Sequence, residues 1–133
     1  MRVLVVEDEA LVALTIEDTL TEAGYDVVGI ADRPEEALEL AGQHKPGLAV
    51  VDVRLASGGD GIALAELLLA AGPMRILFAT ANCGEVRRRA RHGHGCLSKP
   101  FEAGSLVRAL RAVISGQPAD IPGYFSLPFD SET

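Results

Sequence analysis

The stretch Leu48-Ala49-Val50-Val51-Asp52 decides the fold of this 133-residue chain. Four apolar residues in a row are typical of a strand covered on both faces, as in a parallel sheet. A similar run at residues 3–6 leads into Glu7-Asp8, and a third at residues 95–98 leads into Lys99. Because the carboxyl ends of parallel strands share one edge of the sheet, where open α/β folds bind ligands, these polar residues should meet there.

Helical periodicity alternates with the apolar runs. After the first run, Val12, Ile16 and Leu20 recur every three or four residues, and Gly24 can end that helix. The next helix is expected to have Asp32 as its N-cap and to end within residues 43–46. Strands are predicted at residues 3–6, 27–31, 48–52, 75–80 and 95–98, and later helices at 62–71, 83–92 and 103–115. Five strand–helix units predict a flavodoxin-like, doubly wound α/β fold with a five-stranded parallel sheet in the order 2-1-3-4-5.

Residues 1–115 are expected to form one domain, followed by an extended C-terminal tail at residues 116–133. Glycine and proline punctuate the tail, and its apolar periodicity is lost. Its apolar side chains favour burial against a groove of a partner or of a second copy, so a homodimer is compatible with the sequence. These side chains are Tyr124, Phe125, Leu127 and Phe129.

Composition narrows the functional classes. A net charge of −7 argues against unspecific binding to nucleic acid or to an anionic membrane. Two cysteines, Cys83 and Cys96, do not make a disulfide framework, which favours a reducing compartment. The N-terminus shows neither a signal peptide nor a spanning helix, so we expect a cytoplasmic protein.

The carboxylates Glu7, Asp8 and Asp52 suit a divalent cation. Close carboxylates raise one another's pKa, and a bound Mg²⁺, which prefers oxygen ligands and often shares its site with phosphate, removes that conflict. A carboxylate beside the ion is a plausible nucleophile toward a phosphoryl donor. A lysine and a hydroxyl group could then bind the phosphoryl oxygens.

The chain resembles the response-regulator receiver domains of bacterial two-component signalling, and in particular their single-domain type. The resemblance is carried by VLVVEDE at 3–9, VVDVRL at 50–55, FATA at 78–81 and LSKPF at 97–101. It implies that Asp52 is the phosphoacceptor and that Mg²⁺ is held by Glu7, Asp8, Asp52 and the main-chain carbonyl of Arg54. It further implies phosphoryl-binding and switch roles for Thr80, Ala81 and Lys99, and a cis peptide bond before Pro100. One departure stands out, because Cys96 occupies a position where the family usually has an aromatic residue.

The resemblance implies a switch that a histidine kinase or phosphotransfer protein phosphorylates, and not an enzyme beyond its own Mg²⁺-assisted phosphorylation and dephosphorylation. We expect no output domain after residue 115, and therefore expect signalling through a downstream protein partner or a role as a phosphate sink, without nucleic acid or membrane. One alternative is a phosphate-ester hydrolase, although Arg54 stands where such enzymes place a second carboxylate. Another is a receiver locked in one state that serves as a scaffold.

Three clusters also have plainer interpretations. Glu7-Asp8 could be acidic residues that complement a helix start. His92, His94 and Cys96 alternate as zinc ligands can, with Cys83 as the only obvious fourth ligand. The arginines at residues 87–91 form either a solvated helix face or a docking surface for an acidic partner.

Overall fold

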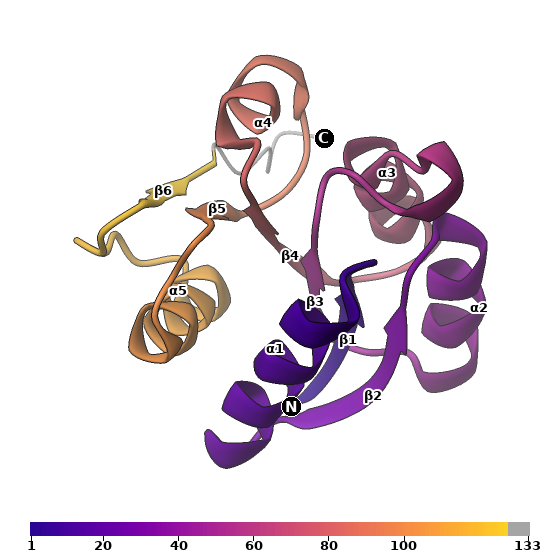
Figure 1. Ribbon diagram of the computed structural model, residues 1–133, viewed down its shortest axis with the longest axis horizontal. Coiled ribbons are helices and arrows are strands. Elements are labelled where there is room, and N and C mark those ends of the chain that lie inside the picture. Colours follow the sequence, from indigo (N-terminus) through magenta and orange to yellow (C-terminus); the bar gives the residue numbers. More distant parts are fainter. Residues whose placement is uncertain (128–133) are drawn as a thin grey trace.

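Six strands and five α-helices alternate along residues 1–127, the part of the chain that this computed structural model describes (Figure 1). The strands are β1 (Arg2–Val6), β2 (Asp26–Ala31), β3 (Leu48–Val51), β4 (Arg75–Thr80), β5 (Gly95–Ser98) and β6 (Tyr124–Ser126). The helices are α1 (Ala10–Glu22), α2 (Pro34–His44), α3 (Gly61–Ala71), α4 (Cys83–Arg89) and α5 (Ala103–Ser115). A short 3-10 helix, Ala56–Gly58, lies in the connection between β3 and α3.

The strands form a single sheet in the order β2-β1-β3-β4-β5-β6. Strands β1 to β5 are parallel, which confirms the flavodoxin-like fold and the order 2-1-3-4-5. The expected number of strands was wrong, because β6 pairs antiparallel with β5 and places Phe125 opposite Cys96. A sheet edge presents unpaired backbone groups, and the returning chain covers those of β5.

Two apolar cores lie on the two faces of the sheet. Helices α1 and α5 cover one face, and α2, α3 and α4 cover the other (Figure 1). Successive strand residues point to opposite faces, so Val5 joins the core under α1 and α5, while Leu4 and Val6 join the other. Because both faces of β1 and β3 are covered, their side chains must be apolar throughout, which explains the uninterrupted runs in the sequence.

Helix boundaries differ from expectation at two places. Arg33, and not Asp32, occupies the N-cap position of α2, and no side chain caps the helix there; the Asp32 carboxylate instead accepts a hydrogen bond from the Arg33 side chain at 2.9 Å. Helix α4 ends at Arg89, short of the predicted residue 92, because Ala90 takes an extended backbone conformation. Both differences concern helix ends, where local propensity is weakest as a guide.

The segment after α5 runs back along the sheet edge. Tyr124 lies over Gly95, where a Cβ atom would come within 2.7 Å of the tyrosine hydroxyl oxygen, so the close approach depends on glycine. Ile121 is buried in the core under α1 and α5. Phe129 lies outside the described residues, and the division of the chain into a domain at 1–115 and a tail stays a prediction. Among residues 1–127, no helix has the length and apolar character needed to span a membrane.

Candidate functional site

Two strand ends bring the three predicted acidic residues to one edge of the sheet. Glu7 and Asp8 follow β1, and Asp52 follows β3. One carboxylate oxygen from each of the three lies within 4.8 Å of the others. Backbone hydrogen bonds hold this register, since the Asp52 amide donates to the Val6 carbonyl at 2.9 Å and the Glu7 amide donates to Ala31 at 2.9 Å.

Lys99 reaches this cluster from the end of β5. Its Nζ donates to Glu7 Oε1 at 2.6 Å and to Asp52 Oδ2 at 2.9 Å, and it lies 3.6 Å from Glu9 Oε1. The Lys99 amide donates to the Thr80 carbonyl at 3.0 Å, and the peptide bond that joins Lys99 to Pro100 is cis. The lysine side chain is only 13% exposed, so its ammonium group sits between two buried carboxylates.

Burial shifts the pKa values of Glu7 and Lys99 in this cluster. It raises the pKa of Glu7 to about 7, and the nearby Asp52 charge adds to this effect, while the hydrogen bond from Lys99 opposes it. Burial also disfavours the charge on Lys99, but hydrogen bonds to Glu7 and Asp52 outweigh it and raise the lysine pKa. One internal cation therefore offsets only part of the negative charge, which leaves a cluster suited to a second cation.

The loop after β3 orients Asp52. The Val53 amide donates to Asp52 Oδ1 at 2.7 Å, so one carboxylate oxygen is held by the backbone and the other by Lys99. Gly61 lies against this loop, and its amide donates to the Val53 carbonyl at 2.7 Å. A Cβ atom on Gly61 would come within 1.9 Å of the Asp52 carbonyl oxygen. This role of Gly61, the first residue of α3, was not predicted from the sequence.

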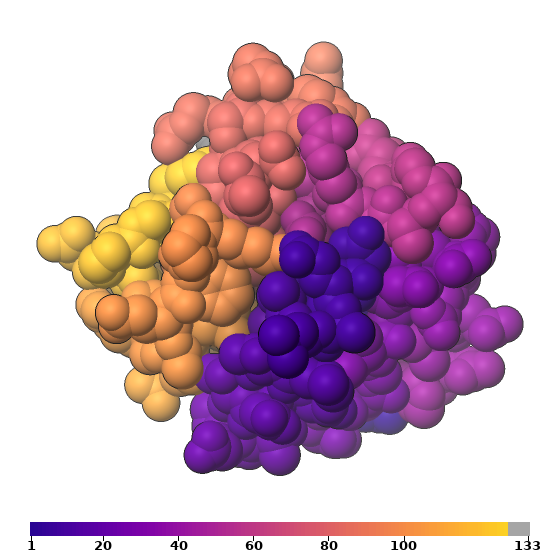
Figure 2. All heavy atoms as spheres, in the orientation of Figure 1, coloured from indigo at the N-terminus to yellow at the C-terminus, as the bar shows by residue number. Residues whose placement is uncertain are grey.

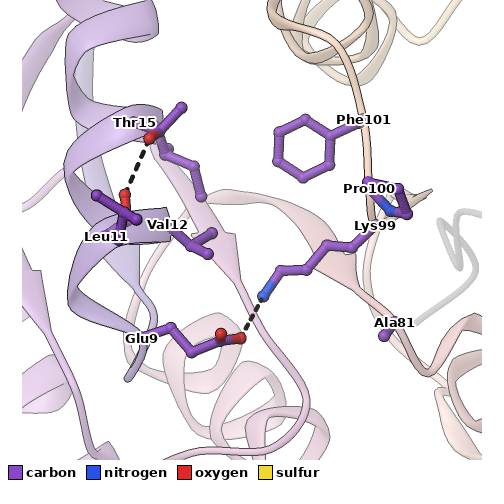
Figure 3. Close-up of a pocket in the computed structure, with 9 residues that line it drawn as sticks. Glu9, Leu11, Val12, Thr15, Ala81, Lys99, Pro100 and Phe101 are labelled. Carbon is purple, nitrogen blue, oxygen red and sulfur yellow. Dashed lines mark hydrogen bonds and ion pairs between the residues drawn. The ribbon is translucent and has the colours of Figure 1, made fainter.

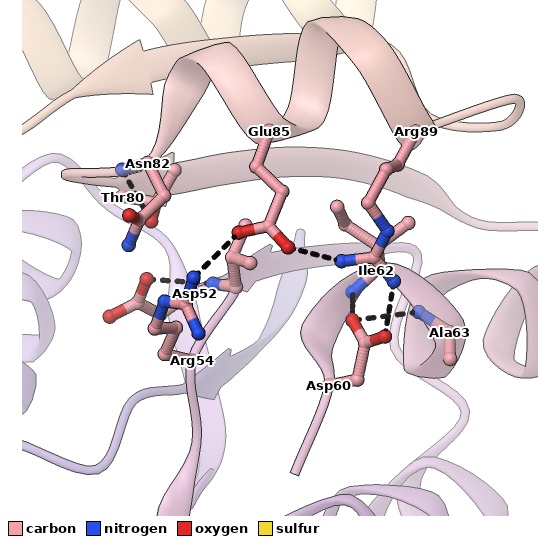
Figure 4. Close-up of polar contacts among 10 residues, drawn as sticks. Asp52, Arg54, Asp60, Ile62, Ala63, Thr80, Asn82, Glu85 and Arg89 are labelled. Carbon is pink, nitrogen blue, oxygen red and sulfur yellow. Dashed lines mark hydrogen bonds and ion pairs between the residues drawn. The ribbon is translucent and has the colours of Figure 1, made fainter. Parts of the chain in front are cut away.

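Thr80 ends β4 close to Asp52. It is fully buried, and its Oγ1 accepts a hydrogen bond from the Asn82 amide at 3.1 Å. In the view of Figure 4, Thr80 and Asn82 lie between the start of α4 and the Asp52 carboxylate. Ala81 is exposed and lies in a cleft beside Lys99. The main-chain carbonyl of Arg54 stays a predicted metal ligand.

A chain of ion pairs connects α4 to the loop after Asp52 (Figure 4). Arg54 donates to Glu85 at 3.1 Å, and Arg89 pairs with both Glu85 and Asp60. Asp60 also caps α3 by accepting hydrogen bonds from the amides of the second and third helical residues. The predicted arginine cluster is therefore divided, with Arg89 in this network and Arg87 stacked over the Phe125 ring at 3.9 Å.

A cleft of about 500 Å³ opens beside Lys99, between α1 and the segment after β5 (Figure 3). Figure 2 shows the indigo N-terminal segment and the orange segment that follows β5 side by side on this face. The cleft wall is mainly apolar, and Leu11 next to it is 78% exposed. It is lined by Glu9, Leu11, Val12, Thr15, Ile16, Ala81, Lys99, Pro100 and Phe101.

The zinc interpretation receives no support. His94 Nδ1 accepts a hydrogen bond from the Ile76 amide at 3.0 Å, and Cys96 lies against Cys83. Within residues 1–127, the only group of three or more potential metal ligands with converging atoms is Glu7, Asp8 and Asp52. The structure therefore favours an oxygen-liganded cation at the sheet edge.

The arrangement of strand ends, acidic cluster and lysine agrees with comparisons to known proteins. A family model described as the response regulator receiver domain matches residues 3–111. The chain belongs to this family. Its match to the transcriptional regulatory protein PdtaR of Mycobacterium tuberculosis is 37% identical over 117 residues, covering 86% of this chain and 57% of PdtaR. The chain thus spans little more than half the length of that relative.

Solved receiver domains share the fold. The receiver domain of PhyR from Erythrobacter litoralis superposes with a TM-score of 0.79 at 27% identity, covering 90% of this chain and 95% of the other. The receiver domain of NarL from M. tuberculosis superposes with a TM-score of 0.75 at 28% identity, covering 87% of this chain and 97% of the other. Receiver domains serve as switches in two-component signalling, bind Mg²⁺ at an acidic pocket, and interact with histidine kinases and downstream proteins.

Proposed function

We propose that this receiver domain is a phosphorylation switch in which Asp52 accepts a phosphoryl group from a histidine kinase or phosphotransfer protein. The observation that carries the proposal is the Lys99 ammonium group, which joins Asp52 to Glu7 within the acidic cluster. Asp52 is buried, ionisable and held at both oxygens. A carboxylate fixed in this way loses little conformational freedom when it attacks a phosphorus atom.

The donor set fits a magnesium ion. Glu7, Asp8 and Asp52 offer only oxygen atoms, and their negative charge exceeds the single positive charge of Lys99. These side chains, with the main-chain carbonyl of Arg54, would hold the ion. Bound Mg²⁺ would supply positive charge that stabilises phosphoryl oxygens.

Protein groups around Asp52 have separate roles. Asp52 Oδ1 or Oδ2 supplies the nucleophilic electron pair, and Lys99 is placed to bind a phosphoryl oxygen on the acceptor. Thr80 ends the adjacent strand, and its hydroxyl group can donate to another phosphoryl oxygen while Oγ1 still accepts from the Asn82 amide. The switch therefore links phosphate at Asp52 to the start of α4.

The phosphodonor protein would dock on α1. The cleft beside Lys99 lies next to the acidic cluster, and Leu11 and Leu14 leave 78% and 52% of their surfaces exposed. Exposed leucines beside a buried reactive group are suited to an apolar helix of a donor protein, which would bring a phosphorylated side chain to Asp52. Output would then pass through a protein partner or through drainage of phosphate from a shared kinase.

The test is phosphorylation by acetyl phosphate with Mg²⁺, followed by intact-protein mass measurement. We expect one phosphoryl adduct on the wild type and none on Asp52→Asn, which keeps the shape but removes the anionic nucleophile. The matched control is Asp32→Asn, because Asp32 follows β2 at the same sheet edge but lies outside the acidic cluster. An undiminished adduct on Asp52→Asn would refute the assignment, and sustained turnover of an organic phosphate ester would indicate a hydrolase.

A further inference from the structure

Two thiols that the phosphorylation site does not use lie against each other. Cys83 is the first residue of α4, and Cys96 lies in β5. Their Sγ atoms are 2.6 Å apart, and both cysteines are free. A disulfide bond is about 2.05 Å long, so bond formation needs a sulfur movement of only about half an ångström.

The surroundings hold the two thiols in this position. Cys96 is fully buried in the core under α4, next to Phe78 and Val86 in the same cluster. The Cys83 thiol also lies 3.8 Å from the Thr80 carbonyl oxygen, to which it donates. Phe125 pairs opposite Cys96 from β6 and packs on the same core. The contact therefore belongs to the junction of α4, β4 and β5.

Exposure separates the roles of the two thiols. Cys83 is partly exposed, whereas Cys96 has no exposed surface. A small oxidant from solvent can therefore reach Cys83 first, while Cys96 is placed to react only with its neighbour. We propose that Cys83 and Cys96 form a redox modification site, which a peroxide converts into an intramolecular disulfide joining α4 to β5.

The reaction balances in two steps. Hydrogen peroxide oxidises the Cys83 thiol to a sulfenic acid, and its O–O bond breaks to release one water. The Cys96 thiol then attacks the Cys83 sulfur, forming the S–S bond, while the S–O bond breaks and a second water leaves. Overall, two thiols and one hydrogen peroxide become one disulfide and two waters. A dithiol reductant reverses the bond.

Ionisation agrees with this order of events. The hydrogen bond with Cys96 lowers the pKa of Cys83 against the opposing effect of burial, and Ser98 and Arg87 lower it further. The same hydrogen bond and burial raise the pKa of Cys96. Because the thiolate is the reactive form, the accessible thiol is also the more reactive one.

The bond would restrain the junction between the phosphate site and α4. Cys83 lies three residues after Thr80, and α4 has only one fully buried side chain, Val86. A covalent link to β5 would fix the first turn of this helix on the sheet. The cross-link needs no phosphorylation, so its formation tests the inference independently of the function proposed above.

The experiment treats the reduced full-length chain with hydrogen peroxide, quenches it, and alkylates it under denaturing conditions. Reduced protein should take up two alkyl groups and peroxide-treated protein none, with a mass loss of two hydrogen atoms that dithiothreitol restores. Peptide mapping should join the Cys83 and Cys96 peptides within monomeric protein. Two alkylatable thiols after treatment, or disulfides only between chains, would overturn the inference.

Two variants separate the thiols. Cys96→Ala should leave a sulfenic acid on Cys83 that a dimedone probe traps, whereas Cys83→Ser should leave Cys96 unlabelled in the folded protein. Hydrogen exchange supplies a readout without mutation, because oxidised wild type should protect residues 83–89 more strongly than reduced wild type. Dimedone labelling of Cys96 in folded, peroxide-treated Cys83→Ser would contradict the assigned order of oxidation. Unchanged hydrogen exchange in residues 83–89 despite a complete cross-link would contradict the restraint of α4.

Discussion

Gly61 illustrates how a missing side chain shapes the phosphorylation site. Any Cβ atom there would overlap the Asp52 carbonyl oxygen, which is backbone and cannot move without displacing the loop. We predict that Gly61→Ala destabilises the fold by at least about 1–3 kcal/mol, the usual cost of overpacking. Urea unfolding measures the loss.

Gly104→Ala is the matched control for Gly61→Ala. Gly104 also lies in the first turn of a helix, but nothing lies within 4 Å of its added Cβ atom. Because alanine has the higher helix propensity, Gly104→Ala should be neutral or slightly stabilising. Equal stability of the two variants would contradict the close approach at Gly61.

His94 should make stability depend on pH. Burial, with the nearby Arg75 charge, lowers its pKa from 6.5 to about 4. Between pH 6.5 and about 4, the His94 ring is protonated in the unfolded chain but stays neutral in the folded protein. The stability present above pH 6.5 is therefore lost as the pH falls toward 4. The loss is on the order of 3 kcal/mol, at about 1.36 kcal/mol per unit.

The measurement compares wild type with His94→Asn, which keeps an acceptor for the Ile76 amide but does not titrate. Comparison is needed because Glu7 acts in the opposite direction, its raised pKa costing stability as the pH rises from 4.5 to about 7. The free energy of unfolding of wild type minus that of His94→Asn, both measured in urea, should fall from pH 7 to pH 4. A difference independent of pH would show that His94 is not held neutral.

Helix α4 is the element best placed to respond to phosphate. It is seven residues long with one buried side chain, whereas α5 buries five, so we predict faster hydrogen exchange in α4 than in α5. The ion pairs that join α4 to the neighbouring loop, Glu85 with Arg54 and Arg89 with Asp60, are partly exposed and therefore add little restraint.

Beryllofluoride with Mg²⁺, a phosphoryl mimic, should change exchange across residues 83–93 more than in α5. Thr80 connects the phosphate site to this segment. Because Cys96 stands where the family usually has an aromatic residue, rotation of an aromatic ring cannot carry the signal, and movement of α4 is the expected route. Asp52→Asn is the control and should not respond. Protection in 83–93 equal to that in α5, unchanged by the mimic, would exclude this route.

The fold as a whole should be stabilised by Mg²⁺, because the acidic cluster has more negative than positive charge. Binding to the native state alone adds about 2.7 kcal/mol at one hundred times the dissociation constant. We therefore predict a higher thermal midpoint for the wild type in Mg²⁺ than in a chelator, and a much smaller difference for Asp8→Asn. Equal wild-type midpoints at millimolar Mg²⁺ would count against the metal site.

Truncation after Ser115 tests how the C-terminal segment relates to the rest. It removes β6, uncovering the β5 edge and the surface of Gly95 that Tyr124 covers, so the thermal midpoint should fall. Phosphorylation of Asp52 should persist, because the groups that contact its carboxylate lie before residue 100. Loss of reactivity in folded, truncated protein would show that the segment belongs to the receiver unit.

Consecutive residues were enough to predict β1 to β5, the helices between them and their order. Apolar runs and helical periodicity are local patterns, and the directions of parallel strands then bring Glu7, Asp52 and Lys99 to one edge. Tertiary structure alone decided that β6 pairs with β5, that Gly61 touches the Asp52 loop and that Cys83 meets Cys96. These contacts join segments distant in sequence, and they depend on edges and surfaces that exist only once the sheet and its helices have packed.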